Sequence, residues 1–201
     1  MARFNGGGQK KERRNRILMG AVVIVIMVSS ALAILNSNTD NASGNPVDYH
    51  GFRFSQQGDT WVVKAGKQQL VFNYHPLELE HINVSSDIIS AINNSNSLLI
   101  TNNPLSVNRD YIAAAELQFS NYSRILFGKS VVNGFTINVT PEVPVITCAN
   151  ASMQNLVIYF TDSNQTAVSM ENGCIKLQAQ YNTDYLRLVD RIQYSLLGIM
   201  G

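Results

Sequence analysis

Hydrophobic and polar residues alternate with a period of two in the stretch that follows residue 47. The alternation is carried by three pairs of apolar residues, Phe52 with Phe54, Trp61 with Val63, and Leu70 with Phe72. Turn-forming residues at 56–59 and 65–67 separate these pairs. Such alternation is typical of half-buried strands, because successive side chains of a strand point to opposite faces. The pattern predicts an antiparallel meander of three strands.

A helical period replaces the alternation further along the chain. Asn108 is a suitable cap, and Gly128 ends an apolar stripe made of Ile112, Ala115, Phe119, Tyr122 and Leu126. Asn121 lies half a turn away from the stripe, which places it on the solvent face of this helix. A last helix is expected after Asn182 or Thr183, with an apolar face of Tyr185, Leu188, Ile192 and Ile199. A shorter helix is expected over 88–92.

The remaining apolar segments are short and are bounded by turn residues, which predicts strands at 97–101, 135–140, 144–148, 156–161, 167–170 and 174–179. Asn172-Gly173 indicates a hairpin between the last two. This order of elements predicts an α/β fold in which a mixed sheet carries two main helices and the meander is added at an edge. A two-layer α+β fold is the alternative.

An uncharged run at residues 17–35 is apolar on every face and matches the length of a transmembrane helix. Residues 1–16, before it, contain six basic residues and one acidic residue. The positive-inside rule therefore predicts a cytoplasmic tail and a signal anchor, with everything beyond exported. A cleaved secretory signal is the alternative, because Ala31-Leu32-Ala33 has the small-x-small pattern of a cleavage site.

The chain after the anchor divides into a flexible linker at 36–46, which is polar, and one extracytoplasmic globular domain at 47–201. The formal net charge of +1 conceals an uneven distribution, because residues 17–201 hold nine basic and thirteen acidic side chains. A mildly acidic domain argues against nucleic acid as its partner. The membrane lipid around 17–35 is the first expected partner. The basic tail also suits contact with anionic lipid or ribosomal RNA, although orientation alone explains it.

The two cysteines of the chain, Cys148 and Cys174, both lie on the exported side. An oxidising compartment would join them, which closes a loop worth about 3.5 kcal/mol in the chain-entropy model. Two buried free thiols are the alternative. The spacing is not that of a redox Cys-x-x-Cys pair, so the predicted role is structural.

Acceptor sequences for N-glycosylation are frequent in this chain. Roughly three are expected by chance from the content of Asn, Ser and Thr. Seven occur, all beyond the apolar run, at Asn41, Asn83, Asn93, Asn121, Asn138, Asn150 and Asn164. Their use would place the protein on an archaeal cell surface or in a eukaryotic secretory route.

Candidate chemistry is concentrated in one short segment, which holds His75, Glu78, Glu80 and His81. Two imidazoles and two carboxylates suit a divalent metal or a general acid and base. The spacing is poor for either, since an extended 77–82 would turn His81 away from both carboxylates. A polar loop or strand edge is the plainer interpretation, and neither a resident metal nor a cofactor is predicted.

The last helix carries charged residues that suit surface ion pairs, with Asp184 three positions before Arg187 and Asp190 beside both Arg187 and Arg191. The templates of a nucleophile elbow, a phosphate loop and an HExxH zinc site do not occur in the sequence. The sequence therefore predicts an exported, membrane-anchored domain that binds another surface or membrane protein. An exported metal-assisted or acid/base hydrolase built on His75, Glu78, Glu80 and His81 is the alternative.

Overall fold

The computed structural model describes residues 45–66, 68–152 and 154–201. They belong to one compact unit, 43–201. The predicted tail at 1–16, the membrane helix at 17–35 and all but the end of the linker at 36–46 lie outside the described residues. Of the helices that the structure describes, none combines the length and the apolar character needed to cross a bilayer.

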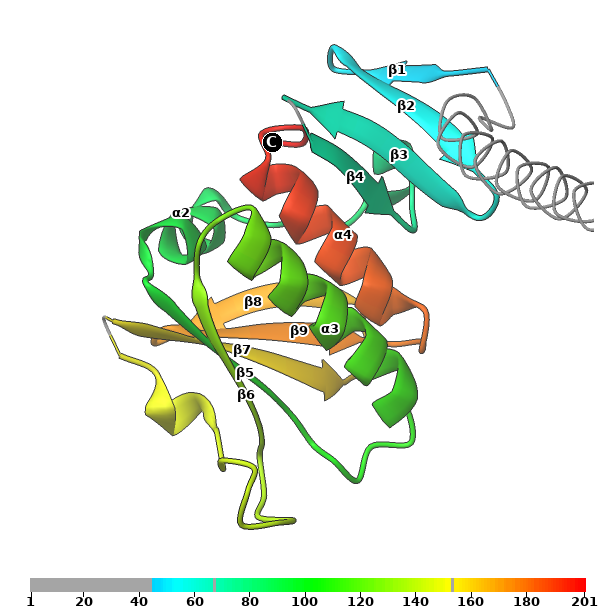
Figure 1. The fold of residues 1–201 in the computed structure, drawn as a ribbon. Helices are drawn as coiled ribbons and strands as arrows, with labels where there is room; N and C mark the ends of the chain where they lie inside the picture. The colour runs from blue at the N-terminus through cyan, green and yellow to red at the C-terminus, as the bar shows by residue number, and fades with distance from the viewer. Residues whose placement is uncertain (1–44, 67, 153) are drawn as a thin grey trace, which may run out of the picture. The chain divides into compact units, whose positions relative to one another are not determined.

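The fold is α+β, with two separate sheets (Figure 1). The first sheet is an antiparallel meander of four strands, β1 (Val47–Tyr49), β2 (Phe52–Gln57), β3 (Thr60–Ala65) and β4 (Gln68–Phe72). The predicted three-stranded meander is thus extended by β1. Phe54, Val63 and Leu70 share the buried face of this sheet, in register across β2, β3 and β4. The meander forms a sheet of its own, so its predicted place at the edge of the mixed sheet is wrong.

The second sheet is mixed and has the strand order β6-β5-β7-β9-β8. Its strands are β5 (Ser97–Asn102), β6 (Ser130–Phe135), β7 (Asn155–Asp162), β8 (Ala167–Glu171) and β9 (Cys174–Ala179). β8 alone runs antiparallel to its neighbour in this sheet, and the others are parallel. The predicted hairpin between β8 and β9 is confirmed, with positive φ at Asn172 and Gly173.

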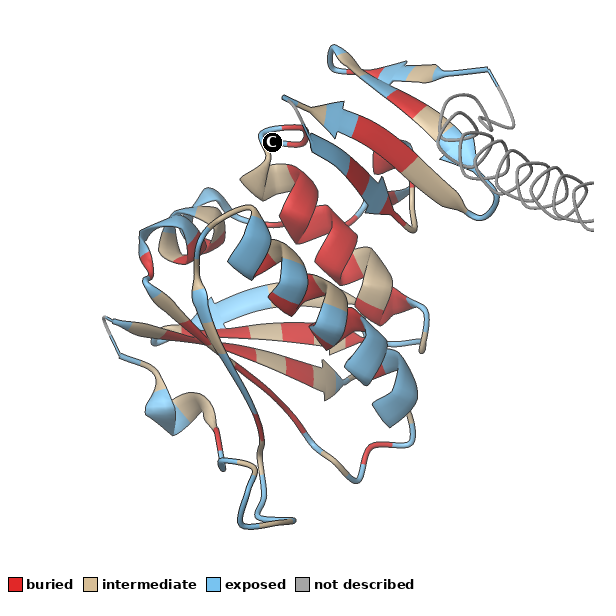
Figure 2. Cartoon of the chain, in the orientation of Figure 1, coloured by how far each residue is buried: buried red, intermediate tan, exposed pale blue. Residues whose placement is uncertain are grey.

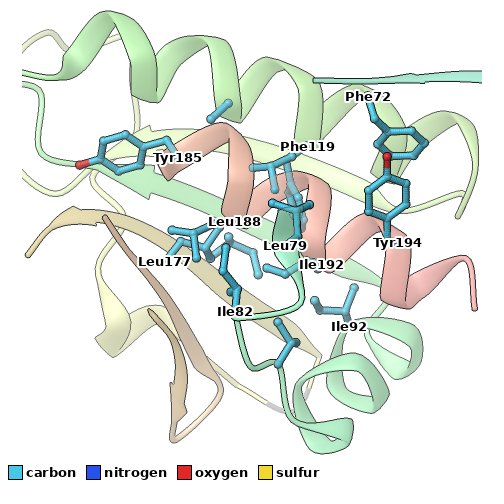
Figure 3. Packing of buried hydrophobic residues seen from close by; sticks show 14 of the residues in the cluster. Phe72, Leu79, Ile82, Ile92, Phe119, Leu177, Tyr185, Leu188, Ile192 and Tyr194 are labelled. Carbon is cyan, nitrogen blue, oxygen red and sulfur yellow. The ribbon is translucent and has the colours of Figure 1, made fainter. Parts of the chain in front are cut away.

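Three α-helices complete the fold of the described residues: α2 (Ser86–Asn94), α3 (Arg109–Ile125) and α4 (Asp184–Leu196). α3 and α4 lie side by side over one face of the mixed sheet (Figure 1). α4 is buried along most of its length (Figure 2), because it also packs against the meander. Figure 3 shows the contact: the Tyr194 ring lies 4.1 Å from that of Phe72, and Leu188 and Ile192 lie on the same helix near Leu177.

The opposite face of the mixed sheet is covered in part by the segment that joins β6 to β7. Ile146 packs there against Val157 and Cys174. The predicted disulfide between Cys148 and Cys174 is confirmed and ties this segment to β9. The strands predicted at 135–140 and 144–148 are wrong. β6 ends at Phe135, and the later segment contributes a single parallel bridge at Val145 and a 3-10 helix, η2 (Cys148–Asn150).

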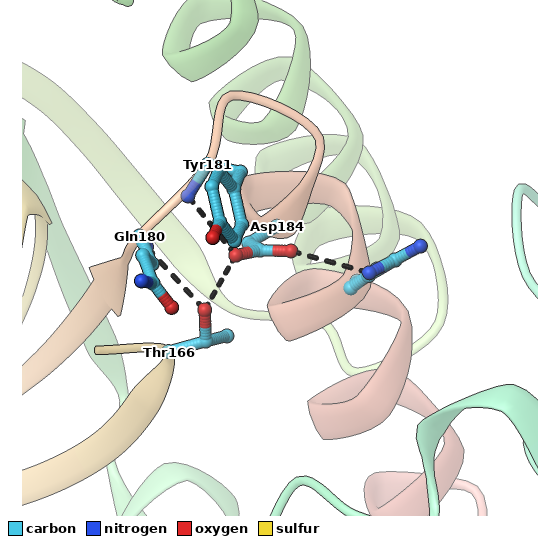
Figure 4. A network of polar contacts seen from close by, with 5 residues as sticks. Thr166, Gln180, Tyr181 and Asp184 are labelled. Atoms are coloured by element: carbon cyan, nitrogen blue, oxygen red, sulfur yellow. Dashed lines mark hydrogen bonds and ion pairs between the residues drawn. The ribbon is translucent and has the colours of Figure 1, made fainter. Parts of the chain in front are cut away.

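Buried polar side chains hold α4 in place at its first turn and at its middle. At its first turn, Asp184 accepts hydrogen bonds from the Thr166 hydroxyl and from the Tyr181 backbone N–H, at 3.0 Å for the latter (Figure 4). Further along, the carboxylate of Asp190 accepts from the backbone N–H groups of Asn73 and Tyr74 at 2.8 and 2.9 Å. Burial, the largest effect on this carboxyl, raises the pKa of Asp190 to about 7.

Candidate functional site

A cavity of about 450 Å³ opens at the carboxyl ends of β5 and β6, beside the first turns of α3. Ligands of α/β sheets commonly bind at this end of parallel strands, where the connecting segments leave room between them. The cavity is lined by Asn102, Pro104, Arg109, Asp110, Ala113, Glu116, Asn133, Gly134, Phe135 and Val143. Size and position make it the candidate binding site.

The inner wall of the cavity carries a buried carboxyl. Glu116 is only 8 % exposed, and its Oε1 accepts a hydrogen bond of 2.8 Å from Nδ2 of Asn102, which is 5 % exposed. Burial dominates the electrostatics and raises the pKa of Glu116 to about 7, although the Asn102 hydrogen bond acts in the opposite direction. The group therefore changes its charge near neutral pH, which is common at binding and catalytic sites.

Gly134 allows the far wall of the cavity to close. A Cβ at this position would lie 2.4 Å from the backbone oxygen of Pro144 and 2.7 Å from Cδ1 of Ile146. The space is needed because the Phe135 N–H donates to Pro144 O at 3.0 Å and the Ile146 N–H donates to Phe135 O at 2.8 Å. Only glycine lets the segment after β6 lie this close to the strand.

The loop between β5 and α3 borders the cavity through Pro104 and presents apolar side chains to solvent. Leu105 is 75 % exposed and Val107 is 95 % exposed, while Ser106 between them is buried. The loop and the segment after β6 leave the same end of the mixed sheet (Figure 1). Two aliphatic side chains thus stand in solvent on one short loop beside the cavity.

Hydrogen bonds to Asp162 at the end of β7 fix the conformation of this loop. Asp162 Oδ2 accepts from the Ser106 hydroxyl, and Oδ1 accepts from Asn108 Nδ2 and the Tyr185 hydroxyl, each at 2.7 Å. Burial of the Asp162 carboxyl raises its pKa, but these three hydrogen bonds outweigh it and leave the pKa below its ordinary value. Asn108 occupies the predicted cap position of α3, yet its side chain holds the loop and makes no capping bond.

The predicted polar cluster surrounds the 3-10 helix η1 (Pro76–Leu79), and none of its members lines the cavity. The extended conformation considered for 77–82 does not occur, because Pro76 starts a helical turn. His75 is 3 % exposed and caps that turn, with Nδ1 accepting from the Leu77 N–H at 3.3 Å. Nδ1 is therefore engaged, and its role as acceptor places the ring proton on Nε2.

The side chain of His75 packs among aromatic rings, 4.9 Å from Phe54 and 4.6 Å from Trp61 between ring centroids. Its Nε2 is buried and has no hydrogen-bond partner in the described part of the chain. Burial lowers the pKa of His75, so the ring is neutral at neutral pH. These contacts give His75 a structural role as a helix cap.

The other members of the cluster point to separate partners. Glu78 accepts from the backbone N–H of His75 at 2.9 Å, and Glu80 accepts from the Tyr49 hydroxyl at 3.2 Å. His81 is exposed. Within the residues that the structure describes, no group of three or more His, Cys, Asp and Glu side chains is arranged to hold a metal ion. The geometry gives no support to a hydrolase at this cluster.

The predicted ion pairs of the last helix are correct only in part. Asp184 and Arg187 do pair, at 3.4 Å, although Asp184 is buried. The pairing predicted for Asp190 is wrong, because its side chain is fully buried and its carboxylate accepts hydrogen bonds from backbone N–H groups. Arg191 is also buried, and it donates to the backbone oxygens of Ile82 and Gly201 at 2.9 and 2.8 Å.

The glycosylation candidates share one property in the structure. Each acceptor asparagine that the structure describes is exposed, and these are Asn83, Asn93, Asn121, Asn138, Asn150 and Asn164. The solvent-facing position predicted for Asn121 on α3 is thus confirmed. Asn41 lies outside the described residues.

The motifs of the sequence did not identify Glu116 as a cavity residue, although its position in the helix could have done so. Glu116 stands four positions after Ile112 and three before Phe119, so it falls on the apolar stripe of α3. A charged residue on the core face of a helix is unusual and indicates a buried polar contact.

Comparison with protein-family models, curated proteins and solved structures finds no match to the chain. The evidence for function is therefore the site itself.

Proposed function

We propose that the protein is a membrane-anchored domain that stands outside the cytoplasm and binds another surface or membrane protein. In this proposal residues 17–35 cross the lipid, the basic tail at 1–16 stays in the cytoplasm, and 47–201 is exported. The disulfide between Cys148 and Cys174 supports export, because such bonds persist in oxidising compartments. The exposure of the six described acceptor asparagines is compatible with glycans on the exported domain.

The main support for a binding role is the β5–α3 loop beside the cavity, which exposes two aliphatic side chains. Leu105 and Val107 are held in solvent by a loop whose backbone is fixed through Ser106, Asn108 and Asp162. Exposed aliphatic side chains on an ordered loop lose little conformational entropy when a partner covers them, so their burial contributes directly to affinity. The loop is therefore the proposed contact surface for the partner protein.

Photo-crosslinking on intact cells tests this proposal. A photoreactive residue placed at Val107 should form a covalent product with one defined protein, and L105S should reduce its yield by removing apolar contact. Leu77 supplies the matched control, since it is also aliphatic and 56 % exposed but belongs to η1 and not to the loop. A photoreactive residue at Leu77 should give no such product, and L77S should leave the product formed at position 107 unchanged. Equal products from both positions, or none from Val107, would contradict the proposal.

A further inference from the structure

The cavity beside the loop contains a carboxyl that no cation neutralises. The charged residues that line it are Arg109, Asp110 and Glu116. Arg109 pairs with Asp110 at 3.7 Å, and both side chains are highly exposed at the mouth. No ion pair among the described residues includes Glu116. A carboxylate that is buried without a countercharge carries an uncompensated desolvation cost, which a cationic ligand would relieve.

Asn102 is the one hydrogen-bond donor to the Glu116 side chain among the described residues, and the inner wall otherwise offers acceptor atoms. An ionised carboxylate only accepts hydrogen bonds, so Asn102 must direct its NH2 group at Glu116 Oε1, and its own carbonyl oxygen stays available. Glu116 Oε2 is the second available acceptor of this wall. Asn133 differs, because its Oδ1 already accepts from the Ser120 hydroxyl at 3.3 Å. A ligand that fits the inner wall must therefore supply donors.

The outer walls fit the apolar part of such a ligand. Pro104, Ala113, Phe135 and Val143 contribute carbon-rich surface between the mouth and Glu116. A volume of about 450 Å³ lies within the usual range for small-ligand sites. A neutral hydroxyl or amide would donate a hydrogen bond but leave the charge uncompensated, whereas an ammonium group provides donors and a positive charge together.

We infer that this cavity binds an alkylammonium group, with the nitrogen between Glu116 and Asn102 and the alkyl stem along Pro104, Ala113 and Phe135. The ammonium group belongs either to a lysine side chain of the partner protein or to a free amine. The inference rests on the proposed function in one respect, since it takes the cavity and the β5–α3 loop as parts of one site.

Calorimetric titration of the full chain in detergent at pH 8 tests the inference with soluble probes. n-Butylamine represents a free amine, and Nα-acetyl-lysine methylamide represents a peptide lysine. n-Butanol and Nα-acetyl-norleucine methylamide are their neutral counterparts. At least one amine should bind saturably and about ten-fold more tightly than its neutral counterpart. The amine that binds more tightly identifies the source of the ammonium group.

Two variants locate the binding. E116Q keeps the shape of the side chain and should weaken amine binding about ten-fold, since it removes the charge. E171Q removes an exposed carboxylate on β8 and should leave the affinity unchanged. The inference is overturned if neither amine binds, if a neutral counterpart binds as tightly, or if E116Q binds as the parent does. Crosslinking through Val107 with no amine binding would remove this inference alone, and amine binding with no crosslinking would remove the proposed protein partner alone.

Discussion

At the scale of single residues, Glu116 shows how the fold sets the chemistry of a side chain. The apolar stripe of α3 carries it into the protein, where Asn102 is its hydrogen-bond donor. One neutral donor does not replace the hydration that a carboxylate loses on burial. The raised pKa is the result, and it makes the charge of the cavity sensitive to pH near 7.

Replacing Glu116 with glutamine is expected to change how stability depends on pH. The pKa of the folded protein is about 7, against 4.5 for the ordinary group, so the folded state holds the proton more tightly. The resulting stabilisation is present below pH 4.5 and is lost as the pH rises through 7, a difference of about 3 kcal/mol. E116Q should therefore exceed the parent in free energy of unfolding by about this amount at pH 8, and by much less at pH 5.

Urea unfolding of the full chain in detergent, followed by circular dichroism at both pH values, measures this difference. Asp190 also has a pKa raised to about 7, but it is present in both proteins and cancels in the comparison. E171Q, which removes an exposed carboxylate and its surface ion pair with Lys176, should stay within about 1 kcal/mol of the parent at either pH. A gain from E116Q that is the same at pH 5 and pH 8 would show that Glu116 does not titrate as described.

At the scale of elements, the sequence predicts best where local pattern and local turn agree. β9 spans Cys174–Ala179 as expected, since its alternation follows the turn at Asn172-Gly173. The strand expected at 135–140 fails because β6 is placed by its pairing with β5, in register from Ser130 to Phe135. That register depends on contacts distant in sequence, and β-propensity alone does not determine it.

The site follows the same division between local and distant information. The position of Glu116 on the apolar stripe of α3 is local, and the sequence contains it. The contacts of Ser106 and Asn108 with Asp162 join residues more than fifty positions apart, and no short motif encodes them. His75 is a contrasting case, because a residue type that suits a metal site serves here as a helix cap.

The disulfide is the element-scale feature most open to a stability test. It joins the segment after β6 to the first residue of β9 across 26 positions. Changing both cysteines to alanine should lower the free energy of unfolding by up to about 3.5 kcal/mol, because the unfolded chain regains the freedom of this loop. Thermal unfolding with and without reductant measures it. The parent should respond to reductant and the double variant should not; equal midpoints for all samples would contradict the prediction.

At the scale of the whole molecule, the described unit is organised around α4. This helix contacts the mixed sheet through Leu188 and Ile192 and the meander through Tyr194, whose hydroxyl donates to Tyr74 O at 2.8 Å. The two sheets therefore share one hydrophobic core. The cavity and the β5–α3 loop lie at the carboxyl ends of β5 and β6, which leaves them accessible while α4 is enclosed.

The proposed topology places the domain and the basic tail on opposite sides of a membrane. Intact cells can be treated with an amine reagent that does not cross membranes, and the labelled lysines identified by peptide mass spectrometry. Lys64 is exposed on β3, whereas Lys10 and Lys11 belong to the tail. With this topology, Lys64 is labelled on intact cells, and Lys10 and Lys11 are labelled only after lysis. Labelling of the tail with protection of Lys64, or protection of all three until lysis, would contradict it.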